Sequence, residues 1–85
     1  MPEICRFQGL IILMFFNDHN PPHFHVWYAE KKAGITIQTF EMLEGTLPPK
    51  AYSLVVQWAT LHQDELLHNW ELCRTGKKPQ RIEAL

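Results

Sequence analysis

Unbroken apolar residues dominate the first part of the chain. Residues 4–16 read ICRFQGLIILMFF, and the seven residues from Leu10 to Phe16 contain no polar side chain. A strand that is buried on both faces has this pattern, because neither of its faces meets water. We therefore predict a central strand over residues 4–16, in which Gly9 allows a bulge or bend.

Further strands are predicted before the middle of the chain. The aromatic and β-branched residues at 23–30 indicate a second strand, and the alternating pattern at 34–39 indicates a third. Residues 31–34, KKAG, are expected to close the hairpin between them. A short fourth strand, or an extension of the sheet edge, is expected at residues 40–43.

The hydrophobic period changes after Pro49. Apolar residues then recur at steps of three and four: Ala51, Leu54, Val55, Trp58, Leu61, Leu66, Trp70 and Cys73. This spacing predicts one long amphipathic helix over residues 49–74, with a kink near His62 to Asp64 and with Asp64 as the cap of its second part. Residues 77–85 are expected to form a partly ordered tail. The predicted fold class is α+β, a three- or four-stranded, mainly antiparallel sheet with one long C-terminal helix packed on it.

The composition is that of one small globular domain spanning residues 1–85. Of its 85 residues, 46% are hydrophobic, and eight basic against nine acidic residues give a net charge of −1. This balance disfavours binding of duplex nucleic acid through backbone charge alone. Cys5 and Cys73 form no CxxC motif and are expected to be reduced thiols. The apolar run at residues 10–16 is too short to span a bilayer and no signal-peptide pattern precedes it, so we expect a soluble, cytoplasmic protein.

Three of the five histidines fall within seven residues. His19, His23 and His25 follow Asp18 in the segment NDHNPPHFH. Alternate residues of a strand share a face, so His23 and His25 are expected to point the same way as Trp27 and to be half-exposed. The two prolines between the loop and the strand are expected to hold Asp18 and His19 near the start of the strand.

This histidine cluster has three interpretations. An H-x-H pair with a third histidine or an aspartate can bind zinc or another divalent metal, and the ligand set is then His19, His23 and His25. Alternatively, His23 and His25 act as acid and base in a metal-independent ribonuclease that has no cofactor, with His19 oriented by Asp18 and with Arg6 or a lysine at the phosphate. In the third interpretation, the histidines only fix a turn and the sheet surface.

The chain resembles a bacterial family known as domain of unknown function 4160. The resemblance is carried by PEICRFQGLIILMFF, FNDHNPPHFHVWY, EMLEGTLP and VVQWATLHQDELLHNWEL. It implies a short, stand-alone protein encoded beside a small partner protein, as in a two-protein toxin–antitoxin module, and it supplies no catalytic residues. The expected function is that of the toxin-like component, acting on RNA or translation through the histidine loop. The alternative is a non-enzymatic protein-interaction module, and in either case we expect a homodimer or a hetero-complex.

Overall fold

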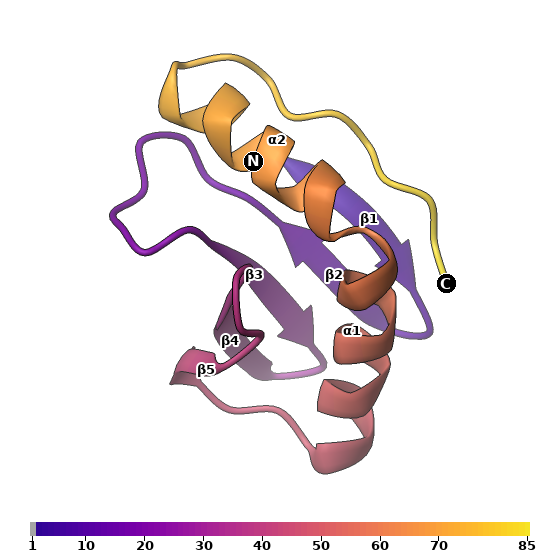
Figure 1. Ribbon diagram of the computed structural model, residues 1–85. Helices are drawn as coiled ribbons and strands as arrows, with labels where there is room; N and C mark the ends of the chain where they lie inside the picture. The colour runs from indigo at the N-terminus through magenta and orange to yellow at the C-terminus, as the bar shows by residue number, and fades with distance from the viewer. Residues whose placement is uncertain (1) are drawn as a thin grey trace.

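A computed structural model describes residues 2–85 of the chain, and over this range five strands form one antiparallel sheet, followed by two helices (Figure 1). The strands lie in the sheet in chain order: β1 (Glu3–Phe7), β2 (Leu10–Leu13), β3 (His23–Tyr28), β4 (Lys31–Thr36) and β5 (Met42–Gly45). The helices are α1 (Pro49–Leu61) and α2 (Gln63–Arg74). The predicted α+β class is confirmed, while the numbers of strands and helices differ from the prediction.

The apolar run at the N-terminus forms a hairpin, and the single strand predicted over residues 4–16 is wrong. Gln8 and Gly9 make a two-residue turn with φ values of 46° and 81°, so Phe7 pairs with Leu10. Two successive left-handed residues are typical of the tight turns that join antiparallel strands. The strand β2 is nevertheless interior, because it pairs with β1 on one side and with β3 on the other.

The next turn also lies earlier than predicted. It is made by Ala29 and Glu30, and Ala29 has a φ of 53°. Lys31 and Lys32, expected in the turn, therefore begin β4, where Lys32 pairs with Trp27. The strand β4 ends at Thr36 instead of residue 39. The strand expected at residues 40–43 is present as β5, two residues further along.

The predicted long helix is divided at His62. The φ and ψ of this residue, −125° and 24°, are not helical, so α1 ends and α2 begins there, at the expected kink. Asp64 is not the cap. It lies in the first turn of α2, where its negative charge interacts favourably with the helix dipole.

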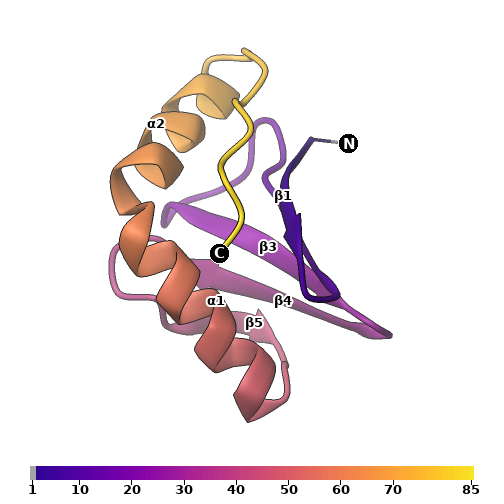
Figure 2. The ribbon, with the colours of Figure 1, turned by 90° about the vertical axis from the view of Figure 1, so that its right-hand side faces the viewer.

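Both helices lie on one face of the sheet (Figure 2). Trp58 of α1 is fully buried in the core between helix and sheet, with its ring centroid 5.8 Å from that of Phe7 and 6.1 Å from that of Phe24. Burial of a side chain of this size contributes about 2–3 kcal/mol to folding. Within residues 2–85, neither helix is long and apolar enough to cross a membrane.

The C-terminal segment, residues 77–85, runs between the helices and β1 (Figure 2). The N–H of Ile82 donates to the carbonyl of Ile4 at 2.8 Å, and the indole N–H of Trp58 donates to the carbonyl of Glu83 at 2.9 Å. Ile82 is 5% exposed, whereas Leu85 is 45% exposed. The segment is therefore part of the folded core and not a free tail.

Candidate metal centre

The candidate centre lies where the loop between β2 and β3 enters the sheet. This loop contributes Asp18 and His19, and the start of β3 contributes His23 and His25. The loop is attached to the end of α2, because the N–H of Asn17 points to the carbonyl of Cys73 at 3.4 Å. The chain thus brings a carboxylate and three imidazoles to one end of the sheet.

Asp18 is the middle of the group. Its Oδ2 lies 3.0 Å from Nε2 of His23 and 2.9 Å from Nε2 of His25. Its Oδ1 lies 2.9 Å from Nδ1 of His19 and accepts the backbone N–H of His19 at 2.9 Å. One carboxylate therefore faces all three histidine rings of the segment.

The ligand atoms that could share one ion come from Asp18, His23 and His25. One nitrogen or oxygen of each lies within 4.8 Å of the other two. His19 is not in this group, because its ring faces the other carboxylate oxygen and its side chain is 74% exposed. The structure thus brings together two of the three histidines proposed from the sequence and adds Asp18 in place of the third.

His23 is fully buried, so the prediction that it is half-exposed is wrong. Trp70 of α2 covers its ring at a centroid distance of 5.3 Å, and the ring of His25 lies 5.0 Å away. His23 is buried because α2 places Trp70 against the start of β3. The periodicity of β3 gives no signal of this contact, which joins residues far apart in the sequence.

The proton on His23 is fixed by a backbone carbonyl. Nδ1 lies 2.7 Å from the carbonyl oxygen of Pro21, which can only accept, so Nδ1 carries the hydrogen. In the neutral ring Nε2 then has a lone pair, and this lone pair is directed to the side where Asp18 lies. Despite its short distance to Asp18, the buried Nε2 has no hydrogen-bond partner in the described part of the chain.

The charge of Asp18 is stabilised by its neighbours. Partial burial acts to raise the pKa of this carboxyl, but hydrogen bonds from the His25 ring and from the backbone and ring of His19, together with the electrostatic effect of His23, outweigh it and lower the pKa to about 2. The group is therefore an anion at neutral pH.

The remaining face of the centre is partly open. The side chains of Asp18 and His25 are each 16% exposed, and the His25 ring packs at a tilt of 46° against Phe15, with a centroid distance of 4.4 Å. Arg6, which the sequence placed at a phosphate, instead forms an ion pair with Glu3 at 2.7 Å. Phe15 and Trp70 were not identified from the sequence as residues that shape the centre, and Pro21 was expected only to hold the loop, not to accept a hydrogen bond from His23.

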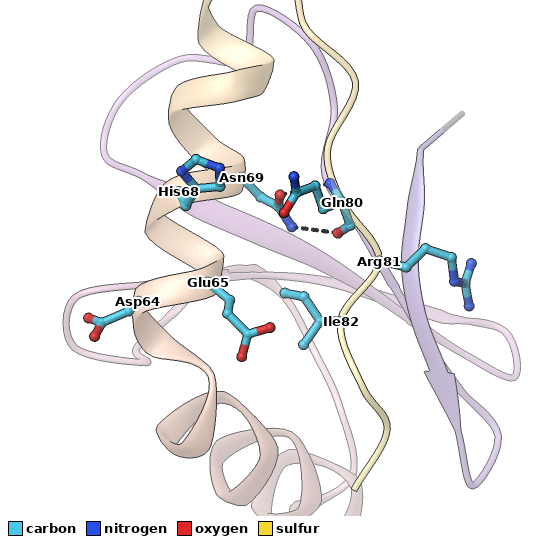
Figure 3. A pocket seen from close by; sticks show the side chains of 7 residues that line it. All are labelled: Asp64, Glu65, His68, Asn69, Gln80, Arg81 and Ile82. Carbon is cyan, nitrogen blue, oxygen red and sulfur yellow. Dashed lines mark hydrogen bonds between the residues drawn. The ribbon is translucent and has the colours of Figure 1, made fainter.

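Away from this centre, a cavity of about 210 Å³ lies between α2 and the C-terminal segment (Figure 3). Its charged groups do not converge on one point. Asp64 points away from the segment, and Arg81 extends towards β1, where it contacts Glu3 at 3.3 Å (Figure 3). The chemistry-bearing groups are thus concentrated at Asp18 and the histidines.

Comparison with known proteins identifies one similarity. The model of a family described as a domain of unknown function (DUF4160) matches residues 9–71, a range that contains the whole centre. Among curated proteins no match is found. Among solved structures there is none either.

Proposed function

The chain belongs to the DUF4160 family, as its sequence motifs indicated, and we propose that it binds a divalent transition metal through Asp18, His23 and His25. Two imidazole nitrogens and one carboxylate oxygen are ligands that suit zinc and neighbouring metals. Asp18 lies in the β2–β3 loop, and His23 and His25 lie at the start of strand β3. The loop is attached to the end of α2 through Asn17 and Cys73.

The observation that carries this proposal is the position of His23, whose Nε2 is buried, lies 3.0 Å from Oδ2 of Asp18 and has no hydrogen-bond partner among the described residues. With its Nδ1 hydrogen bonded to Pro21, a neutral ring places a lone pair near the Asp18 carboxylate, and two acceptors at 3.0 Å repel each other. A cation between them removes the repulsion and satisfies the buried nitrogen. Metal-bound histidines commonly donate their second N–H to a carbonyl in this way, which fixes the ring for coordination.

The distances also suit an ion of this size. Ligand atoms at 2.0–2.1 Å from a tetrahedral zinc ion lie roughly 3.3 Å from one another. The carboxylate oxygen of Asp18 lies 2.9 and 3.0 Å from the two nitrogens, which is within a few tenths of an ångström of that spacing, and all three ligand atoms lie within 4.8 Å of one another.

Three protein ligands are typical of catalytic zinc sites, which keep one position for water or substrate. A metal in such a site acts as a Lewis acid and lowers the pKa of bound water. The partial exposure of Asp18 and His25 supports access from solvent to this fourth position.

Acid–base catalysis by the histidines alone is less well supported. His23 is fully buried, with one nitrogen bonded to Pro21 and the other facing Asp18, so neither nitrogen is available to a substrate. The toxin-like role, the partner protein and action on RNA or translation stay predictions that rest on the resemblance.

Metal titration tests the proposal. The protein is stripped with a chelator, dialysed, and titrated by calorimetry with Zn²⁺, and with Co²⁺, whose visible absorption reports tetrahedral coordination. We expect one ion per chain for the wild type, and at least a tenfold weaker affinity for Asp18→Asn and His25→Ala.

The matched control is His68→Ala, which removes an exposed histidine of α2 and should bind the metal like the wild type. The proposal is overturned if the wild type binds no ion, or if the Asp18 and His25 variants bind as tightly as the control.

A further inference from the structure

The face of the sheet opposite the helices carries an ordered row of side chains. Arg6, Ile11, Trp27 and Lys32 are aligned in register across β1 to β4. Residues in register on neighbouring antiparallel strands point to the same side. An aromatic ring and an aliphatic side chain are thus flanked by a cation at each end of the row.

A groove of about 360 Å³ lies beside this row and adjoins the metal centre. It is lined by Phe15, His25, Trp27, Lys32 and Glu44, together with backbone and small residues of β4 and β5. His25 belongs both to the groove and to the proposed ligand set. A molecule in the groove would therefore lie next to the metal.

Glycine at position 34 helps to shape the groove. Gly34 lies opposite His25 in the sheet, and Glu44 lies opposite Gly34 on its other side. A Cβ at Gly34 would be only 3.1 Å from Cγ of Glu44, so the glycine lets the Glu44 side chain lie across β4. The far wall of the groove is thus a carboxylate.

We propose that this groove binds a nucleotide, with its base against Trp27 and Phe15 and its phosphate between Lys32 and the metal. Half-buried aromatic rings on an open sheet bind unstacked bases, because every base offers a flat π surface. Lys32 supplies the cation for the phosphate; its Nζ lies over the Trp27 ring, 4.8 Å from the ring centre, and its flexible side chain must swing off that face when a base stacks there.

The charges in the groove orient such a ligand. Glu44 repels a phosphate and can accept a hydrogen bond from an amino group of a base. Lys32 and a bound metal attract the phosphate at the other end. The net charge of −1 and the size of the groove favour a free nucleotide or a single strand over a duplex.

This inference deepens the proposed function and rests on it for the position of the phosphate, since the base contacts involve no metal. Tryptophan fluorescence offers a direct test. Trp58 and Trp70 are 0% and 5% exposed, so a stacked base quenches Trp27 in preference to the other two.

The titrants are AMP, CMP, adenosine, inorganic phosphate, and eight-residue RNA and DNA single strands, each added to metal-free and zinc-loaded protein. We expect saturable quenching by the nucleotides, with tighter binding when zinc is present. The single strands, compared with the mononucleotides, show whether the natural source is a free nucleotide or a polymer. An eight-base-pair duplex should bind at least tenfold more weakly than its single strands.

Substitutions in the groove test whether it is the site at which the nucleotide binds. By calorimetry, Trp27→Ala should weaken AMP binding at least tenfold. Lys32→Gln should weaken AMP at least fivefold but leave adenosine unchanged. Lys50→Gln, which removes an exposed lysine of α1, is the matched control and should bind like the wild type.

The inference is overturned if no nucleotide binds, if the duplex binds as well as the strands, or if Trp27→Ala and Lys32→Gln match the control. Its failure is separable from that of the metal centre. Zinc binding without nucleotide binding refutes the groove alone, and nucleotide binding to a protein that takes up no metal refutes the centre and the proposed phosphate position.

Discussion

Asn69 of α2 and Gln80 of the C-terminal segment are joined by two hydrogen bonds, and Figure 3 draws the one that the Asn69 side chain donates. The side-chain amide of Asn69 donates to the Gln80 carbonyl at 2.8 Å and accepts the Gln80 N–H at 2.8 Å. The side chain thus satisfies both backbone groups of Gln80, as a neighbouring strand would. Asn69 is 1% exposed, so these bonds are shielded from water.

Substitution of Asn69 should therefore release the C-terminal segment. In Asn69→Ala the backbone groups of Gln80 lose their partners, and we expect a loss of about 2 kcal/mol in the free energy of unfolding. Urea denaturation measures this loss. The neighbouring exposed residue supplies the control, His68→Ala, and equal stability of the two variants would show that the segment is held by other contacts.

Two glycines with positive φ should differ in their tolerance of a side chain. Gly45 has a φ of 74°, and a Cβ there would lie 2.0 Å from the carbonyl oxygen of Lys32. Gly76 has a φ of 81° with no atom within 4 Å of such a Cβ. We expect Gly76→Ala to cost about 1 kcal/mol, from the backbone conformation alone. Gly45→Ala should cost about 3 kcal/mol or more, because β5 must move. Thermal denaturation of both variants checks the order, which a similar loss in the two would contradict.

The histidines should contribute unequally to stability in the absence of metal. His23 is fully buried against Trp70, so His23→Ala leaves a cavity and an unpaired carbonyl at Pro21. We expect it to cost about 2–3 kcal/mol. His19→Ala, whose side chain is 74% exposed, should change stability by less than about 0.5 kcal/mol. Denaturation in the presence of chelator compares them. If the two variants were equally stable, the burial of His23 would contribute nothing to the free energy of unfolding.

Zinc should stabilise the folded chain. A ligand at 100 times its dissociation constant adds about 2.7 kcal/mol, which for a domain of this size raises the melting temperature by roughly 10 °C or more. Differential scanning fluorimetry with and without zinc measures the shift. Asp18→Asn should show little of it, because a neutral amide is a poor ligand for this metal. A shift of equal size in the variant would place the binding elsewhere.

Local sequence patterns determined the class of this fold. The steps of three and four after Pro49 fix the helical region, because they recur over many turns and have one period. His62 interrupts that region where the kink was predicted. The concentration of Asp18, His19, His23 and His25 in eight residues also marked the candidate site from the sequence alone.

The first hairpin shows what local patterns leave undetermined. The mostly apolar segment at residues 4–16 is equally consistent with one long strand and with two strands that both pack into the core. The positive φ values at Gln8 and Gly9 decide between them, and they arise from the pairing of β1 with β2.

The centre itself was decided by tertiary contacts. The sequence could name four candidate ligands but could not choose among them, because the direction of each ring depends on partners distant in the chain. Trp70 buries His23, Pro21 fixes its proton, and Asp18 turns one oxygen to His19 and the other to His23 and His25. A strand's alternation specifies only which face a side chain takes, whereas burial and coordination depend on what the rest of the fold places against that face.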